Sequence, residues 1–227
     1  MNILALETTT KFLCIGIYKD GAVYEYSIEA GRKMSLLVAV TIKRVLDAVS
    51  LGVNDINYFV CGVGPGSFTG IRLGLATVKG LAFASRGHLI GVPTLEIIAR
   101  NVPGRGNRII TLVDAKRDLL YCGIYRNQGT GLKSLEPDRL LTVPQAIKEI
   151  RSNDIITGDG IALCKDAVIK KASGVTILDK DDWYPKGCAI IALALEKIRA
   201  GISERSSLPR YLYPKECQVR GTYAARK

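Results

Sequence analysis

The chain has 227 residues, which can bury one large hydrophobic core or two small ones, so we expect a single domain or a closely joined pair. Lysine and arginine outnumber aspartate and glutamate by 32 to 21, a net charge of +11 that is typical both of a basic soluble surface and of a protein that meets phosphate backbones. No apolar run approaches the roughly 20 residues of a membrane span, no signal peptide is recognisable, and the six cysteines form no C-x-x-C pair, so we exclude a membrane protein and predict a cytoplasmic one.

An internal repeat organises the chain. Residues 3–18 are ILALETTTKFLCIGIY, and residues 110–125 are ITLVDAKRDLLYCGIY, aligned without a gap. Each copy predicts a strand, a turn led by an acid and a second strand, and the alignment matches Glu7 in the first turn to Asp114 in the second. The sequence therefore predicts two lobes that share one design.

Strands and helices alternate along the rest of the first lobe. The Asp20-Gly21 dipeptide predicts a tight hairpin turn, and Ser35 is placed to cap a helix that ends before Gly52. A glycine-rich segment follows a buried strand, and its second half is helical in composition. In chain order, the predicted elements are a strand at 22–28, a helix at 35–50, a strand at 58–63, a helix at 70–84, a strand at 88–92 and a short helix at 94–100.

The second lobe follows a linker, VPGRGN, at residues 102–107, and has predicted helices at 144–151, 162–172 and 188–200. The predicted order is three strands, a helix, a strand, a helix and a strand, and the chain contains it twice. This is the topology of ribonuclease-H-like lobes paired across a cleft. We therefore predict an α/β protein of the actin, sugar-kinase and Hsp70 (ASKHA) superfamily. The first lobe spans residues 1–101 and carries the docking helices described below. The second, degenerate lobe spans 102–227, and its last helix can pack back on the first lobe.

In that superfamily the acid-led turns hold ATP phosphates and a metal. Both turns of this chain lack the glycine that lets backbone amides approach a phosphate, and two long cations follow Asp114 in the second turn. We keep Glu7, Thr8, Thr9 and Asp114 as candidates for a degenerate nucleotide site, against the alternative that neighbouring backbone amides satisfy both acids. We expect this chain alone to bind no nucleotide.

Residue types exclude other catalytic centres. His88 is the only histidine in the chain, so no H-x-x-x-H or H-E-x-x-H pair exists, and neither a histidine-ligated metal nor a Ser-His-Asp centre is predicted. The glycine-rich segment also lacks the Gly-Lys-Ser/Thr of a P-loop, since Lys79 comes two turns later. We therefore predict no catalytic residue and no metal site.

Two helices of the first lobe carry apolar residues on two faces. One face of each has the spacing of a core stripe, and Gly70 and Gly74 lie one turn apart, which lets the second helix pack closely on the sheet. The other face mixes apolar and charged residues and predicts a docking surface for a partner, against the alternative that both helices are deeply buried. The docking candidates are Leu36, Leu37, Val40, Lys43, Arg44, Asp47, Arg72, Leu75, Ala76, Lys79 and Phe83.

Five segments of the chain stand out together: GVGPGSFTGIRLGLATVKGLA at residues 62–82, ILALETTT at 3–10, PTLEIIA at 93–99, VDAKRDLLYCGIY at 113–125 and LPRYLYP at 208–214. With these segments the chain resembles one known family, the bacterial TsaB (YeaZ) family. The glycine-rich run is highly specific, and the resemblance covers nearly the whole chain.

The resemblance implies a non-catalytic scaffold or activating subunit in the synthesis of threonylcarbamoyladenosine (t6A), a modified base of tRNA. Such a subunit docks to a catalytic TsaD-like partner through helices that match residues 35–50 and 70–84, a TsaE-like ATPase joins the complex, and tRNA is met through the complex. ATP or ADP and the metal are then expected in the partner subunits. The same face can form a homodimer when the catalytic partner is absent.

Two features depart from the family pattern. Members commonly have a His-Ser-Glu run before paired leucines, where this chain has Lys33-Met34-Ser35, and the chain continues past LPRYLYP as a basic tail. The basic residues near its end are Arg205, Arg210, Lys215, Arg220, Arg226 and Lys227. Three other functions stay open: an ATP-dependent kinase or ATPase of the same superfamily, a peptidase, and direct RNA binding through the tail.

Overall fold

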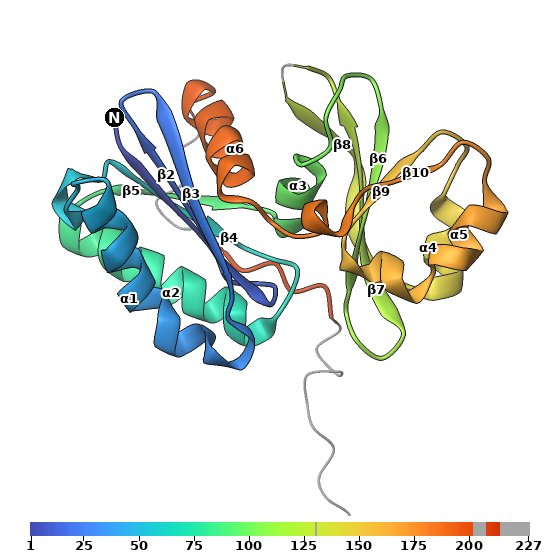
Figure 1. The fold of residues 1–227 in the computed structure, drawn as a ribbon, viewed down its shortest axis with the longest axis horizontal. Helices are drawn as coiled ribbons and strands as arrows, with labels where there is room; N and C mark the ends of the chain where they lie inside the picture. The colour runs from blue at the N-terminus through green and yellow to red at the C-terminus, as the bar shows by residue number, and fades with distance from the viewer. Residues whose placement is uncertain (130, 202–207, 214–227) are drawn as a thin grey trace, which may run out of the picture.

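The computed structural model describes residues 1–129, 131–201 and 208–213, which form two α/β lobes side by side (Figure 1). Apart from Arg210, the basic residues predicted for the tail lie outside the described residues. Among the residues that the structure describes, no helix has both the length and the apolar character needed to cross a membrane.

A five-stranded sheet with helices on both faces forms the first lobe. Its strands and helices are β1 (Ile3–Glu7), β2 (Phe12–Lys19), β3 (Ala22–Glu29), α1 (Met34–Ala48), β4 (Tyr58–Gly62), α2 (Phe68–Ser85), β5 (His88–Val92) and α3 (Thr94–Ala99). The strand order is β3-β2-β1-β4-β5, with β1 antiparallel to β2 and parallel to β4. The predicted cap at Ser35 was wrong, because a 3-10 turn over Gly31–Lys33 leads directly into α1 without a side-chain cap.

The second lobe repeats this topology. Its strands and helices are β6 (Arg108–Asp114), β7 (Leu119–Asn127), β8 (Leu132–Thr142), α4 (Val143–Glu149), β9 (Ile155–Thr157), α5 (Lys165–Lys171), β10 (Thr176–Ile177) and α6 (Gly187–Arg199). The strand order β10-β9-β6-β7-β8 mirrors that of the first sheet element by element. The predicted helix at 162–172 is divided into a 3-10 turn over Asp159–Leu163 and α5. The chain therefore has the duplicated ribonuclease-H-like lobes of the ASKHA superfamily.

Alternating side chains of each strand fill cores on both faces of the first sheet. Leu4 and Leu6 of β1 pack with α1 and α2, whereas Ile3 and Ala5 pack with α6. Although α6 comes last in the chain, it covers the first sheet rather than the second (Figure 1). The third helix of the first lobe, α3, packs against the second sheet in a separate hydrophobic cluster. Both α3 and α6 therefore lie between the sheets.

The last described segment, residues 208–213, also runs between the lobes, and we call it the strap. Its Arg210 amide donates to the Val63 carbonyl of the first lobe at 2.8 Å. Its Leu212 and Tyr213 side chains pack against the cluster formed by α3, β6 and β7. The strap thus contacts both lobes.

Candidate functional site

The first turn encloses its acid completely. Glu7 ends β1 with no exposed surface, and a Cβ at Gly62 would overlap its carboxylate. The Thr9 amide donates to Oε1 at 2.5 Å, and the Thr94 hydroxyl donates to Oε2 at 3.0 Å. Burial raises the pKa of Glu7, and the hydrogen bonds from Thr9 and Thr94 oppose that rise. Both carboxylate oxygens are therefore held inside the lobe.

The threonine hydroxyls of this turn are engaged internally as well. Thr8 is buried, and its Oγ1 donates to the Gly70 carbonyl at 2.7 Å. Thr9 is also buried, and its Oγ1 lies 3.0 Å from Thr94 Oγ1. The close approach of α2 depends on two glycines, because a Cβ at Gly70 would overlap the Thr8 carbonyl and one at Gly74 would lie 2.5 Å from Thr8 Oγ1. These glycines pack against the turn itself.

The acids of the two turns are not structurally equivalent. In the first hairpin Glu7 pairs with Cys14, whereas in the second Val113, not Asp114, pairs with Tyr121. The second turn thus contains one residue more, and a shift by one residue moves a side chain to the other face of a sheet. The gapless match of Glu7 to Asp114 was therefore wrong, and the two acids point to opposite faces of their respective sheets.

The second turn is closed by its own residues. Asp114 accepts hydrogen bonds from the Lys116 amide at 2.7 Å and from the Lys116 ammonium at 2.5 Å. The Asp114 amide donates to Asp159 at 3.0 Å, and burial raises the pKa of Asp159 while this hydrogen bond opposes the rise. Lys116, Arg117 and Asp118 have φ values of 65°, 56° and 57°, a left-handed run that non-glycine residues rarely adopt and that accommodates the additional residue.

These contacts leave the candidate nucleotide residues Glu7, Thr8, Thr9 and Asp114 in two separate, internally bonded turns. Within the described part of the chain, no three His, Cys, Asp or Glu side chains come together as they would around a metal ion. Sequence reasoning missed Thr94 and Asp159, which hold the turns closed. Thr94 follows β5 and contacts the β1–β2 hairpin of the first lobe. Asp159 follows β9 and contacts the β6–β7 hairpin of the second lobe.

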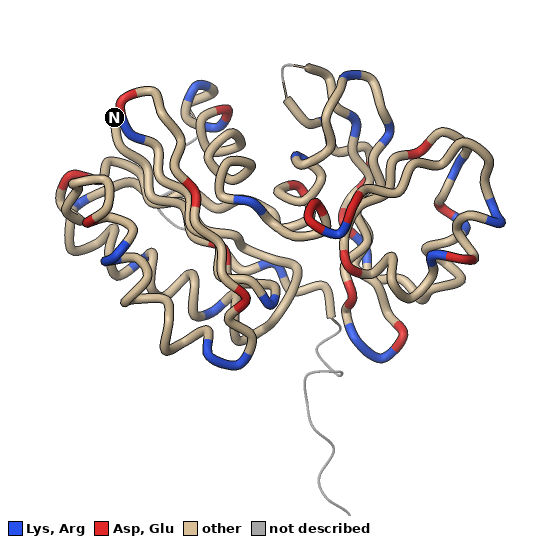
Figure 2. The backbone as a smooth tube through the Cα atoms, viewed as in Figure 1, with Lys and Arg blue, Asp and Glu red and all other residues tan. Residues whose placement is uncertain are grey.

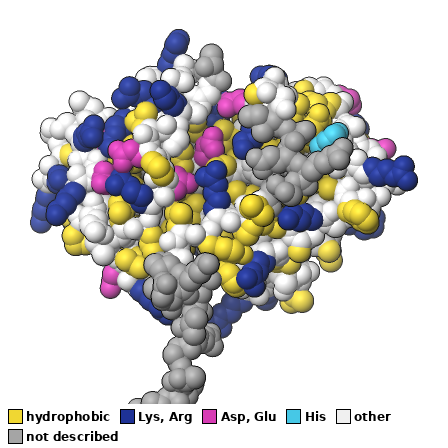
Figure 3. Space-filling view, turned by 180° about the vertical axis from the view of Figure 1, so that it is seen from behind, with side chains coloured by type: hydrophobic (Ala, Val, Ile, Leu, Met, Phe, Trp, Pro, Cys, Tyr) yellow, Lys and Arg dark blue, Asp and Glu magenta, His cyan; other side chains and the backbone are white. Residues whose placement is uncertain are grey.

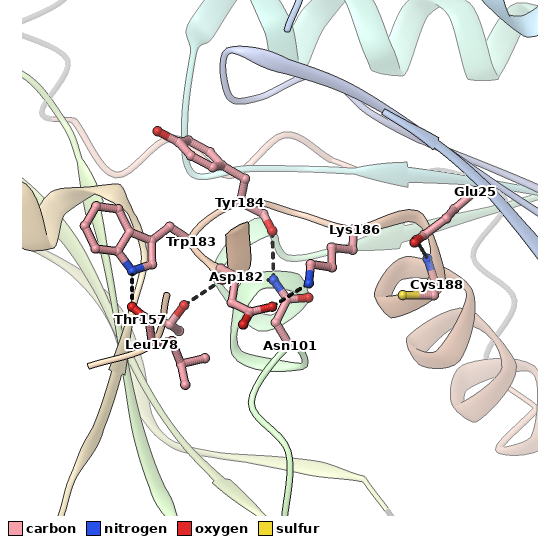
Figure 4. Close-up of polar contacts among 9 residues, drawn as sticks. All are labelled: Glu25, Asn101, Thr157, Leu178, Asp182, Trp183, Tyr184, Lys186 and Cys188. Atoms are coloured by element: carbon pink, nitrogen blue, oxygen red, sulfur yellow. Dashed lines mark hydrogen bonds and ion pairs between the residues drawn. The ribbon is translucent and has the colours of Figure 1, made fainter. Parts of the chain in front are cut away.

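The segment between β10 and α6 ties the lobes together (Figure 4). The Asn101 amide group donates to the Asp182 carbonyl at 3.0 Å and to the Tyr184 carbonyl at 2.8 Å. The Thr157 hydroxyl donates to the same Asp182 carbonyl at 2.8 Å. At the start of α6, the Cys188 amide donates to Glu25 of β3 at 2.9 Å. The segment is thus hydrogen-bonded to elements of both lobes.

A cavity of about 930 Å³ opens beside this segment. The rings of Phe12 and Tyr184 meet at its wall with centroids 4.7 Å apart, and Lys11 Nζ lies 5.1 Å and 5.2 Å from those centroids. Lys11 also pairs with Glu29 at 3.1 Å. Aromatic and paired charged side chains therefore bridge the lobes directly after the first turn.

The outer faces of α1 and α2 expose large apolar side chains. The exposed fractions are 73% for Leu36, 58% for Val40 and 90% for Phe83. A groove of about 300 Å³ lies between the two helices. The charged candidates Lys43, Arg44, Asp47 and Lys79 and the small Ala76 are exposed on the same helices, with Lys43 paired to Asp47 at 2.8 Å.

Three docking candidates lie differently from the prediction. Leu75 is only 6% exposed and packs in the core, because it shares the buried face of α2 with Ile71 and Val78. Leu37 is half-buried against the same core. Arg72 is exposed, but its guanidinium stacks on Phe68 and its Nε donates to the Tyr211 hydroxyl at 3.2 Å, so it contacts the strap.

Comparisons with known proteins place these features in context. Residues 28–202 match the model of the family described as TsaD, tRNA N6-adenosine threonylcarbamoyltransferase. The chain is 25% identical over 220 residues to the tRNA threonylcarbamoyladenosine biosynthesis protein TsaB of Escherichia coli strain K12, covering 93% of this chain and 94% of that protein. It is 26% identical over 155 residues to the TsaB of Bacillus subtilis strain 168, covering 68% of each chain.

A solved structure shares the arrangement of both lobes. YeaZ from Pseudomonas aeruginosa superimposes with a TM-score of 0.81 at 21% sequence identity, covering 93% of this chain and 99% of that one. The fold described above is therefore that of an experimentally determined protein over nearly the whole chain.

Proposed function

Because the chain belongs to the family that the TsaD model describes, and within it to the TsaB (YeaZ) branch, we propose that it serves the biosynthesis of threonylcarbamoyladenosine in tRNA as a non-catalytic subunit. Its curated relatives carry the name of this biosynthesis, and the chain takes part in the same process. The subunit role is the finer part of the proposal. It is supported by the two closed turns, which leave neither Glu7 nor Asp114 free to hold a nucleotide or a metal.

The subunit docks to a TsaD-type catalytic partner through the outer faces of α1 and α2. In this proposal a TsaE-type ATPase joins the complex, tRNA is met through the complex, and ATP or ADP and the metal are bound by the partners. Without the catalytic partner, the same face joins two copies of this chain in a homodimer.

One observation carries the proposal: Leu36, Val40 and Phe83 expose large apolar surfaces on two adjacent helices. Large apolar side chains that stay exposed on adjacent helices are typical of interaction sites. Charged residues of α1, including the Lys43–Asp47 pair, lie beside them as a polar rim would. Seen from behind, the molecule also shows hydrophobic side chains interspersed with lysines and arginines over its lower part (Figure 3).

Reconstituted tRNA modification tests the subunit role. The measurement is the yield of threonylcarbamoyladenosine, by mass spectrometry of digested tRNA, with the catalytic partner present and this chain included or omitted. We expect the yield to depend on this chain and to stay within about twofold in the Glu7→Gln and Asp114→Asn variants, because neither acid acts in chemistry. A loss of about a hundredfold or more in a variant that folds and docks normally is the size expected for a catalytic group and would reject the non-catalytic role.

An ATP-dependent kinase or ATPase is the second candidate, favoured by the duplicated lobes and the cavity of about 930 Å³ between them. Calorimetric titration of the isolated chain with MgATP decides between the two. The subunit proposal predicts no heat of binding and no ADP release. Tight binding with turnover by the chain alone would replace the subunit proposal with the enzyme.

A further inference from the structure

A second, smaller cavity lies between the start of α2, the β6–β7 turn and the strap. Its volume is about 330 Å³, at the small end of the range of ligand pockets. Two arginines and four aromatic residues contribute to its wall. The lining side chains include Phe68, Arg117, Tyr121, Arg210, Tyr211 and Tyr213.

The aromatic rings of this pocket are arranged in two pairs. Phe68 and Tyr211 lie with ring centroids 5.1 Å apart, and Tyr121 and Tyr213 lie edge to face at 6.2 Å. Phe68 is 41% exposed and Tyr211 is 36% exposed, so ring surface remains open to a ligand. Arg72 stacks on Phe68 with its guanidinium carbon 3.7 Å from the ring centroid, so a cation lies beside the aromatic pair at the rim.

Hydrogen bonds hold the three walls of the pocket in place. The Tyr213 hydroxyl donates to the Ala115 carbonyl at 2.7 Å, which joins the strap to the β6–β7 turn. The Arg210 amide donates to Val63, and Arg72 donates to the Tyr211 hydroxyl, which joins the strap to the first lobe. The pocket is therefore formed before a ligand arrives, and such preorganisation reduces the entropy lost on binding.

Positive charge dominates the polar lining of the pocket. Arg117 is exposed at the tip of the β6–β7 turn, where Figure 2 shows basic residues next to acidic ones at the lower edge of the second lobe. Of the acids nearby, Asp118 is exposed next to Arg117, Asp114 pairs with Lys116, and Asp138 contacts the Tyr125 hydroxyl at 2.7 Å and Arg210 at 3.7 Å. Past the strap, the sequence continues with Lys215, Arg220, Arg226 and Lys227 against one acid, Glu216.

We propose that this pocket binds single-stranded RNA, with one base stacked on the Phe68–Tyr211 pair and the adjoining phosphates paired with Arg117 and Arg210. Aromatic platforms beside arginines are the chemistry by which proteins hold unpaired nucleotides, because every base has a face to stack and every phosphate accepts a guanidinium. An acidic peptide would pair with the arginines but would leave the aromatic rings unused. The inference goes beyond the proposed function, in which tRNA is met only through the complex.

The test is fluorescence anisotropy of a labelled, unstructured 12-nucleotide RNA titrated with the isolated full-length chain. Tyr211→Leu removes the ring and is expected to weaken binding about 5-fold to 150-fold, the range for the loss of one stacked base. Arg117→Ala is expected to weaken binding and to reduce the slope of log Kd against log salt concentration by about 0.7, the value for one phosphate contact on a single strand. Arg126→Ala, at an exposed arginine of β7 outside the pocket, removes the same charge and is expected to change Kd less than twofold.

Three results would overturn the proposal. The first is equal weakening by Arg117→Ala and Arg126→Ala with no effect of Tyr211→Leu, which would show unspecific attraction to the net charge. The second is RNA binding that is lost on removal of residues 214–227 but is unchanged in both pocket variants. The third is AMP binding as tightly as the RNA, which would assign the pocket to a free nucleotide.

Crosslinking of 4-thiouridine-labelled RNA, followed by peptide mass spectrometry, gives an independent readout. A crosslink to the peptide containing Phe68 or Tyr211 supports the proposal, and crosslinks confined to other peptides contradict it. Circular dichroism and co-purification with the catalytic partner show that the variants are folded. They also separate a failure of this inference from a failure of the proposed function.

Discussion

The packing of α2 on the first turn makes a sharp prediction, because two glycines of this helix differ only in what surrounds them. A Cβ at Gly74 would lie 2.5 Å from Thr8 Oγ1 and 3.1 Å from Cys61 Sγ, whereas a Cβ at Gly80 would meet nothing within 4 Å. Thr8 has little freedom to move away, since its Oγ1 donates to the Gly70 carbonyl at 2.7 Å. The pair of variants Gly74→Ala and Gly80→Ala therefore isolates the contact with the turn.

Both substitutions gain about 1 kcal/mol of intrinsic helix stability, because alanine replaces glycine inside a helix. Gly80→Ala keeps that gain, which raises Tm by about 2–4 °C in a chain of this length. Gly74→Ala also overpacks a buried site at about 1–3 kcal/mol, so its free energy of unfolding is expected to lie about 1–3 kcal/mol below that of Gly80→Ala. Thermal unfolding followed by circular dichroism measures the difference. Equal stabilisation by both alanines would refute the close packing of α2 on the first turn.

Three further predictions concern buried groups. Because burial raises the pKa of Glu7, the protonated side chain stabilises the fold below the unfolded pKa near 4.5, and this stabilisation is lost as pH rises through the folded pKa. Glu7→Gln is therefore expected to gain stability relative to the wild type as pH rises. Parallel pH profiles of the two proteins in urea unfolding would contradict this. Thr94→Val leaves the Glu7 carboxylate without one donor and is expected to lower the free energy of unfolding by about 1–3 kcal/mol, whereas an unchanged urea midpoint would show that this hydrogen bond adds no stability. Burial raises the pKa of the Cys14 and Cys122 thiols to about 12, so iodoacetamide is expected to modify the exposed Cys188 before either of them in the native protein at pH 8, and faster labelling of Cys14 in a peptide map would refute the placement of β2.

The repeat made the two-lobed fold predictable from the sequence. Helical and strand periodicity located the strands and helices of the first lobe, the strands of the repeat and the helices of the second lobe, but no range was predicted for β8, β9 or β10. The one-residue difference between the turns was not predictable, since a gapless match of side chains carries no information on pairing register. Only backbone geometry, with three left-handed residues from Lys116 to Asp118, shows where the additional residue lies.

The candidate site was predictable in outline only. Exposed Leu36, Val40 and Phe83 follow from helical spacing, but the burial of Leu75 depends on how far α2 rotates over the sheet, which periodicity fixes only to within a residue. The strap could not be placed from the sequence, because its position between the lobes rests on long-range contacts such as that of Arg210 with Val63. The same holds for Thr94, which is 87 residues from the acid that it holds.

The affinity of this chain for its TsaD-type partner tests the central claim most directly. Isothermal titration calorimetry compares the wild type with Val40→Glu and Phe83→Glu on the docking face, and with Ile169→Glu as a control. Ile169 is an apolar residue of α5 in the second lobe that is 59% exposed. We predict that the two docking variants lose about 30-fold or more in affinity, the effect of an interface residue worth about 2 kcal/mol, and that Ile169→Glu stays within twofold of the wild type. Wild-type affinity in both docking variants would contradict the account.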